Sequence, residues 1–186
     1  APNEGTATSY FVGDFDGKEF KSDKKTQKWL DYGTDNYAFV TWNNIPKDDG
    51  RIIGIGWMSN WQYAQIVPTE KWRSAMTVAR SVELRKIDSN YKLVFQPVKE
   101  LSNYRSVKYK KDAIAIKRTE KIIDSKAIDL SSTEINFKIS DLKNSGFNFK
   151  LSNKQGDTLI FGYDNTNNNF FIDRRKSGKI DYSENF

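Results

Sequence analysis

The sequence of 186 residues contains no histidine and no cysteine. It therefore cannot supply an imidazole general base, a Ser-His or Cys-His nucleophile pair, a thiolate zinc site or a disulfide bond. Any chemistry that these residues perform must depend on carboxylates, hydroxyls, Lys, Arg or Tyr. Long apolar runs are also absent, since no stretch approaches the roughly 20 residues of a membrane-spanning helix, and we expect no membrane partner.

Aromatic residues are plentiful where other apolar residues are scarce. Hydrophobic residues make up 37% of the chain, but aromatics reach 14%, which argues against disorder. Lys and Arg exceed Asp and Glu by 30 to 24. The basic stretch from Arg105 to Arg118 is interleaved with tyrosines, as in some nucleic-acid-binding segments, but Asp112 interrupts it. We interpret it as a solvated mixed-charge face and expect no nucleic-acid partner.

Short strand-like runs separated by polar turns predict an all-β fold. A first hairpin is expected from Ser9–Phe15 to Lys18–Phe20, with Asp16-Gly17 as its two-residue loop. A second joins Asn36–Trp42 to Arg51–Trp57. Further strands are expected at residues 75–80, 82–87, 91–96, 113–118, 135–139, 147–152, 158–163 and 170–173.

Composition changes in the middle of the chain. All five tryptophans precede residue 97, and none follows it. Weak helical periodicity at Pro97–Tyr104 permits about two helical turns. A boundary between two domains near residues 97–107 explains both observations.

Asp14 and Asp16 are the first candidate carboxylates. Their period-two spacing places both on one strand face, as a glycosidase or metal site can require. Asp16 also precedes Gly17 at a predicted turn, where aspartate is favoured for backbone reasons. We favour the turn.

Two aromatic segments are the candidate binding regions. In Gly56–Tyr63, Trp57 ends a strand and Trp61 follows it among Asn60, Gln62 and Tyr63, which predicts an exposed indole beside amides. Rings and amides together suit sugars, whereas burial of both indoles in a core is the alternative. Asp31–Tyr37 places two carboxylates and two phenols around a glycine, and it fits either a polar-ligand site or a structural turn.

Four ordered segments within the first 80 residues resemble glycoside hydrolase family 32, the fructan-cleaving levanases, exo-inulinases and invertases. Residues 96–101, 171–174 and 177–178 fit the same family more loosely. The four segments are Tyr10–Gly17 (YFVGDFDG), Trp29–Ala38 (WLDYGTDNYA), Gly56–Tyr63 (GWMSNWQY) and Pro68–Thr77 (PTEKWRSAMT).

The resemblance implies a five-bladed β-propeller joined by a short linker to a β-sandwich. On this basis residues 1–96 are the last propeller strands, 97–107 the linker and 108–186 the first part of an incomplete sandwich. We therefore expect a fragment of such an enzyme, whose partner is the missing N-terminal part of the propeller. The resemblance also suggests secretion or a periplasmic location.

The resemblance further implies retaining hydrolysis of β-fructosidic bonds by two carboxylates, with no metal and no cofactor. The family's Asn-Asp-Pro-Asn, Arg-Asp-Pro and Glu-Cys motifs do not occur in the sequence. We therefore expect no catalytic residue in this chain, and no hydrolysis of levan, inulin or sucrose by the chain alone.

The resemblance carries over one wall of the fructose pocket. It places Trp61 where the family lines the subsite of the terminal fructose, with Trp57 as the less favoured alternative. Asp35 and Tyr37 keep the motif at the pocket rim, and Asn36 stands where relatives often carry an aromatic residue. A second hypothesis is a free-standing carbohydrate-binding β module that uses Trp57, Trp61 and Tyr63.

Overall fold

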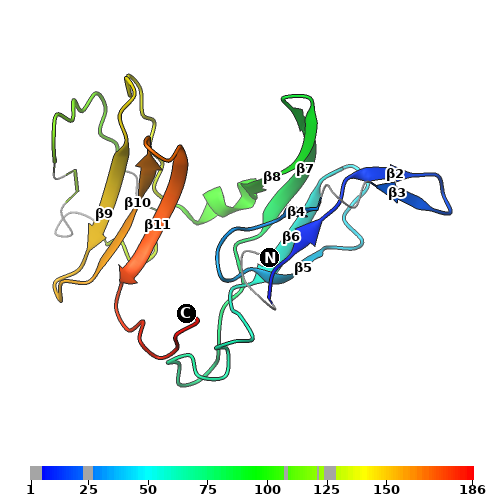
Figure 1. The fold of residues 1–186 in the computed structure, drawn as a ribbon, viewed down its shortest axis with the longest axis horizontal. Coiled ribbons are helices and arrows are strands. Elements are labelled where there is room, and N and C mark those ends of the chain that lie inside the picture. Colours follow the sequence, from blue (N-terminus) through cyan, green and yellow to red (C-terminus); the bar gives the residue numbers. More distant parts are fainter. Residues whose placement is uncertain (1–5, 23–26, 107–108, 121, 124–128) are drawn as a thin grey trace. The chain divides into compact units, whose positions relative to one another are not determined.

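The computed structural model describes residues 6–22, 27–106, 109–120, 122–123 and 129–186, and it is all-β, as the sequence predicts (Figure 1). No helix in these ranges has the length and apolar character needed to cross a membrane. The elements are β1 (Ser9–Tyr10), β2 (Gly13–Phe15), β3 (Phe20–Ser22), β4 (Lys28–Trp29), β5 (Tyr37–Thr41), β6 (Ile52–Trp57), β7 (Arg80–Ile87), β8 (Asn90–Pro97), the 3-10 segment η2 (Lys99–Tyr104), β9 (Phe147–Ser152), β10 (Thr158–Asp164) and β11 (Asn169–Lys176).

The chain forms two compact units. Unit 1 comprises Ala1–Arg105 together with the C-terminal segment Lys179–Phe186, and unit 2 comprises Ser106–Gly178. The predicted helical segment at the boundary is present as η2, although it is a 3-10 helix rather than two α-helical turns.

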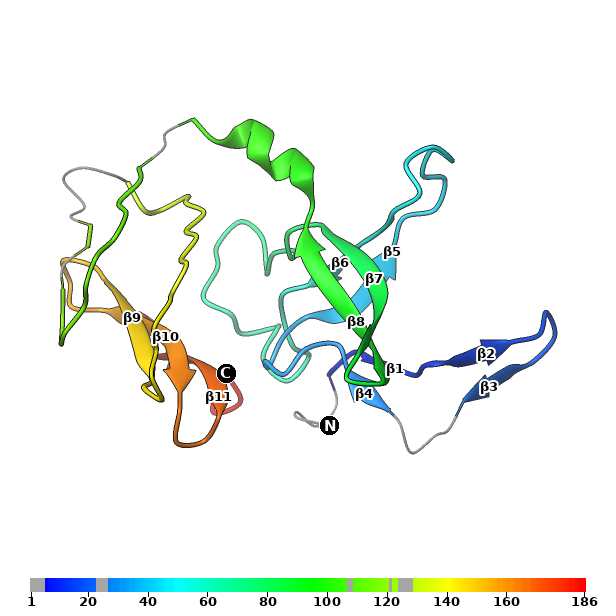
Figure 2. The same ribbon diagram turned by 90° about the horizontal axis from the view of Figure 1, so that it is seen from above.

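The largest sheet of unit 1 has the order β5-β6-β7-β8, and each neighbouring pair is antiparallel (Figure 2). The predicted hairpin β5–β6 is confirmed, and Tyr37 lies opposite Trp57 at its end. Strands β7 and β8 form a second hairpin, whose tip residues Asp88 and Ser89 have positive φ angles of 48° and 66°. This conformation suits a two-residue hairpin loop.

The strand predicted at residues 75–80 is wrong. The pair Gly54↔Arg80 belongs to the β6–β7 ladder, whereas Trp57↔Met76 is an isolated bridge. The second strand therefore has one more residue between these pairs than β6 has, which is the geometry of a bulge. The interruption leaves residues 75–79 outside β7, although Thr77 N still donates to Gly56 O at 2.8 Å.

The hairpin β2–β3 confirms the first predicted turn, with its loop shifted by one residue. Asp16 N donates to Glu19 O at 3.2 Å, so Gly17 and Lys18 are the loop residues, and Gly17 has φ of 94°. The Asp16 carboxylate accepts hydrogen bonds from the backbone of Lys18 and Glu19. These bonds, that from Glu19 first, lower the pKa of Asp16. Asp16 is therefore a turn residue, while Asp14 lies opposite Lys21 in the ladder.

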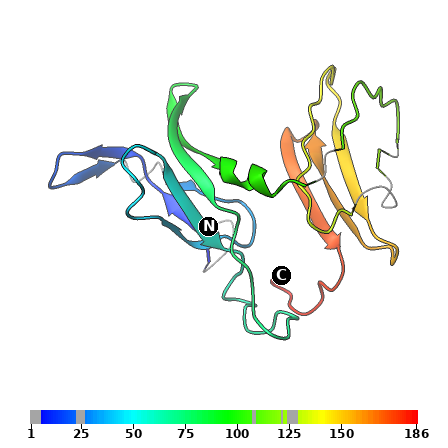
Figure 3. The same cartoon turned by 180° about the vertical axis from the view of Figure 1, so that it is seen from behind.

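Unit 2 contains an antiparallel sheet of order β11-β10-β9 (Figure 3). Its aromatic face carries Phe149 opposite Phe161, and Phe137 stacks on Phe149 with ring centroids 3.6 Å apart. The strands predicted at 113–118 and 135–139 are wrong, because neither segment pairs with the sheet. The segment at 135–139 contributes the Phe137 ring, stacked on Phe149, instead of a ladder.

Candidate functional site

Three aromatic side chains meet where β5 begins and β6 ends, and we call Tyr37, Trp57 and Trp61 the aromatic cluster. The Tyr37 and Trp57 ring centroids are 6.4 Å apart. Trp61 approaches Trp57 edge to face at 5.0 Å, and it remains 59% exposed. The structure thus brings together three of the five residues that sequence analysis assigned to a fructose pocket, and it confirms the prediction of an exposed indole.

Glycines in β6 make room beneath the cluster. A Cβ at Gly54 would lie 2.4 Å from the Phe39 ring, and a Cβ at Gly56 would lie 2.0 Å from Asn36 Oδ1. Since real Cβ atoms do not approach so closely, larger residues would displace these side chains. The two glycines let Phe39 of β5 and Asn36, which precedes β5, pack directly against the backbone of β6.

The loop after β6 is shaped by Asn60, which is fully buried. Its Nδ2 donates to Thr34 O at 2.8 Å, and its Oδ1 accepts from Gln62 N at 2.9 Å. The interpretation of Asn60 as an amide that faces a sugar is therefore wrong. Its side chain is used to hold the loop, which leaves the adjacent Trp61 at the surface.

Asp35 lies next to the cluster in sequence and is half-buried. The Tyr63 hydroxyl donates to Asp35 Oδ1, and it lies 3.3 Å from Thr34 Oγ1. This hydrogen bond holds the Asp35 carboxylate through Oδ1. Tyr63 makes no hydrogen bond to the other carboxylate oxygen, Oδ2. Asp35 can therefore both be held in place and accept a hydrogen bond from a hydroxyl group.

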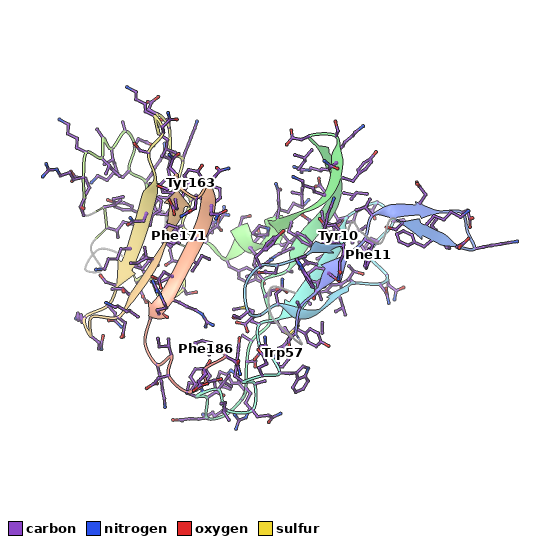
Figure 4. The ribbon with its side chains drawn as sticks, in the orientation of Figure 1. Tyr10, Phe11, Trp57, Tyr163, Phe171 and Phe186 are labelled. Carbon is purple, nitrogen blue, oxygen red and sulfur yellow. The ribbon has the colours of Figure 1, made fainter. Side chains whose placement is uncertain are left out.

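The Tyr63 ring is itself covered by the C-terminal segment of unit 1. It is only 2% exposed, and it packs edge to face against Phe186 at 5.2 Å and Tyr182 at 6.3 Å. Figure 4 labels Phe186 and Trp57 at the same end of unit 1. The hypothesis that Tyr63 is a ligand-facing ring is therefore wrong, because it lies behind the site as a support for Asp35.

Asn36 is buried and has a positive φ of 72°. Its Nδ2 donates to Asp31 Oδ2 at 3.1 Å, and its Oδ1 has no hydrogen-bond partner among the described residues. Asp31 also accepts a bond from Gly33 N at 2.8 Å, so it closes the turn before β5. Asn36 thus lies beneath the surface that carries Tyr37, Trp57 and Trp61.

The arrangement is suited to binding rather than to bond cleavage. Flat indole and phenol rings stack on the C–H faces of sugars, and a fixed carboxylate accepts hydrogen bonds from their hydroxyls. Within the described residues, no group of three or more Asp and Glu side chains is close enough to hold a metal ion.

Sequence reasoning missed Tyr182 and Phe186. They are two aromatics in a polar segment that follows unit 2, and nothing in the local pattern relates them to Tyr63. Within the segment, the only regularity is that Tyr182 and Phe186 are four positions apart, and this does not identify Tyr63 as their partner.

Comparison with known proteins identifies both parts of the chain. The family model for the glycosyl hydrolases family 32 N-terminal domain matches residues 2–97, and the model for the C-terminal domain of the same family matches residues 100–186. The chain is 37% identical to the levanase of Bacillus subtilis over 191 residues. It is 47% identical to an extracellular exo-inulinase of Meyerozyma guilliermondii over 90 residues, which are 48% of this chain.

Solved structures show the same relationship. The exo-inulinase from Aspergillus awamori matches with a TM-score of 0.66 and 26% identity over 97% of this chain. The fructofuranosidase from Schwanniomyces occidentalis complexed with fructose matches with a TM-score of 0.58 and 26% identity over 92% of this chain.

These matches cover only part of each relative. The chain spans 28% of the levanase, and its structure spans 36% of the exo-inulinase and 36% of the fructofuranosidase. The matches run through both units, from the propeller-type N-terminal domain into the sandwich-type C-terminal domain, as the sequence resemblance predicts. The chain belongs to glycosyl hydrolase family 32.

Proposed function

We propose that the chain is part of a retaining β-fructosidase that cleaves β-fructosidic bonds in a fructan or in sucrose. Its contribution is one wall of the fructose pocket. Trp61 faces the sugar, Trp57 and Tyr37 support it, Asp35 accepts a hydroxyl hydrogen bond at the rim, and Asn36 lies beneath. The observation that carries the proposal is the exposed Trp61 indole, held edge to face on Trp57 at the end of β6.

The names of the relatives support the substrate class. They are a levanase, exo-inulinases, invertases and fructofuranosidases, and one solved relative holds fructose. We assign residues 1–96 to the propeller, 97–107 to the linker and 108–186 to the first part of the sandwich. The family models that end at residue 97 and begin at residue 100 support the boundary near residue 97, while Lys179–Phe186 packs in unit 1.

In this proposal the nucleophile and the acid/base carboxylate belong to the remaining N-terminal part of the propeller. Exposed aromatics in unit 1, such as Phe15 and Phe20, support such a partner, because large apolar side chains at a surface mark places where another part of a protein packs.

The test is a chimera in which residues 1–186 replace the matching stretch of the Bacillus subtilis levanase. We expect the chimera to release fructose from levan, inulin or sucrose. Trp61→Ala should lower kcat/KM about tenfold, which is about 1.4 kcal/mol, chiefly by raising KM, because stacking acts on bound sugar in both ground and transition states.

Trp72→Ala is the matched control, since Trp72 is 73% exposed and outside the aromatic cluster. It should change kcat/KM by less than twofold. A folded chimera that releases no fructose, or equal losses in the two variants, contradicts the proposal. The isolated chain should release no fructose, and release by it would place the catalytic carboxylates within these 186 residues.

The carbohydrate-binding module is a second candidate, because the aromatic cluster is complete within unit 1. Calorimetry with inulin and levan oligosaccharides separates the two functions. Micromolar binding by the isolated chain that is lost in Trp61→Ala favours the module, whereas weak or absent binding favours the pocket wall.

A further inference from the structure

A second hollow lies on the sheet of unit 2, far in sequence from the aromatic cluster. It is an open depression of about 350 Å³ next to β9, β10 and the turns that flank them. Its volume lies within the range of small-ligand pockets, about 300–1,000 Å³. The residues that matter for its chemistry are Asn144, Asn148, Tyr163, Asp164, Asn165 and Phe171.

Strand register places two of the lining residues on one face of the sheet. Asn148 of β9 and Phe171 of β11 both lie opposite Gly162 of β10. Because successive residues alternate between faces, these positions share the face opposite to Phe149 and Phe161.

Close strand approach requires this glycine. A Cβ at Gly162 would lie 2.1 Å from Phe147 O, and one at Gly146 would lie 2.7 Å from Tyr163 O. Any larger residue would push the strands apart. The hollow combines these strand residues with the turn residues Asn144, Asn165 and Thr166.

The polar groups around the hollow are of two kinds. The side-chain amides of Asn144, Asn148 and Asn165 make no hydrogen bond to another described residue, so each can donate and accept. Asp164 is held by Thr166 N at 2.9 Å and by Asn167 Nδ2 at 2.6 Å. These bonds, that from the Asn167 side chain first, lower the pKa of Asp164.

We propose that this hollow is a second carbohydrate-binding site, which takes a neutral sugar ring against Phe171 while Asn148 and its neighbouring amides bind the hydroxyls. Phe171 is 36% exposed, which offers part of a ring for stacking. None of the lining side chains is cationic, and Asp164 repels anions, so phosphorylated or acidic ligands do not fit. The choice of fructan as the natural sugar rests on the proposed function.

The test follows the Asn side-chain amide signals of the full chain by NMR during titration with inulin oligosaccharides and, separately, with maltohexaose. We expect saturable shifts at Asn144, Asn148 and Asn165 with a dissociation constant in the millimolar range. Phe171→Ala and Asn148→Ala should each weaken binding at least fivefold. Both side chains are at the surface, and circular dichroism checks that the variants fold.

Two controls isolate the site. Ile172→Ala changes the neighbouring, exposed position on the opposite face and should leave the affinity unchanged. Trp61→Ala should also leave it unchanged, since the aromatic cluster belongs to unit 1. Equal weakening by Ile172→Ala and Phe171→Ala would overturn the proposal.

The two sugars separate this inference from the proposed function. Saturation by maltohexaose but not by inulin oligosaccharides keeps the hollow as a sugar site and counts against fructan as its ligand. No saturable shift with either sugar overturns the hollow as a site, while fructose release by the chimera tests the proposed function independently.

Discussion

A single buried amide determines how the loop after β6 presents its tryptophan. The Asn60 side chain donates to Thr34 O and accepts from Gln62 N. The backbone carbonyl of Asn60 accepts from Ala64 N at 2.8 Å. The loop is thereby pinned to the turn before β5. Trp61 has no comparable anchor and stays at the surface, where it approaches Trp57.

Asn60→Ala should lower the free energy of unfolding by about 1–3 kcal/mol, because it removes two part-buried hydrogen bonds, to Thr34 O and from Gln62 N. Chemical denaturation followed by tryptophan fluorescence measures this loss. Asn43→Ala is the control, since Asn43 is an exposed turn residue. Equal midpoints for the two variants would show that the Asn60 bonds do not hold the loop.

The exposed indole could be predicted from sequence, but the directions of its neighbours could not. An Asn-Trp-Gln-Tyr loop has the same local pattern whether Asn and Tyr turn outward or inward. Burial of Tyr63 is decided by Tyr182 and Phe186, which lie more than a hundred positions later in the chain. Such contacts leave no trace in spacing or composition near Tyr63.

At the level of elements, one ionic network connects the β5–β6 loop with η2. Arg51 forms ion pairs with Asp49 at 2.5 Å and with Glu100 of η2 at 2.7 Å. The Arg51 side chain lowers the pKa of Asp49 to about 2 and also lowers the pKa of Glu100. The network fixes the end of the sheet to the segment that leads out of unit 1.

These lowered pKa values give the network a pH dependence of known sign. A carboxylate with a depressed pKa in the folded chain adds stability above its ordinary pKa, and this stability is lost as pH falls through the folded value. The melting temperature of the natural chain should therefore fall as the pH is lowered from about 4 to about 2. Arg51→Met should reduce this pH dependence.

Arg85→Met is the control for Arg51→Met. Arg85 pairs with the exposed Glu83 of its own strand and joins no second element. Arg85→Met should leave the change of the melting temperature with pH in the acid range the same as in the natural chain. If the slopes of both variants match that of the natural chain, the network does not contribute to stability.

Hairpins were predictable because their signals are local. Asp16-Gly17 and the turn residues between β5 and β6 mark chain reversal within a few positions. Strands at 113–118 and 135–139 were predicted wrongly, since strand formation depends on the pairing that the tertiary context provides as well as on the sequence. Apolar alternation around Phe137 reflects a ring packed on Phe149, which the same pattern fits equally well.

At the scale of the whole molecule, unit 1 is discontinuous in sequence. Lys179–Phe186 follows unit 2 along the chain but packs in unit 1, where Phe186 and Tyr182 cover Tyr63. The Asp35 carboxylate thus depends on a covering that comes from the far end of the chain. This arrangement makes the C-terminal segment part of the support for the proposed fructose pocket.

Phe186→Ala should lower the free energy of unfolding by about 1 kcal/mol, since the ring is half-buried and full burial of a Phe contributes about 1.5–3 kcal/mol. The loss should be visible by differential scanning calorimetry. Tyr104→Ala removes a highly exposed ring and should change stability by less than about 0.5 kcal/mol. Identical melting curves for Phe186→Ala and the natural chain would show that the ring does not stabilise unit 1.

The return of the last residues to unit 1 also imposes an order on biosynthesis. A nascent chain exposes Tyr63 and Asp35 long before Phe186 leaves the ribosome, and all of unit 2 must be translated in between. The contact closes a loop whose entropic cost rises with the logarithm of its length. Unit 2 can fold as its strands emerge, whereas unit 1 reaches its final packing only after Phe186 has emerged.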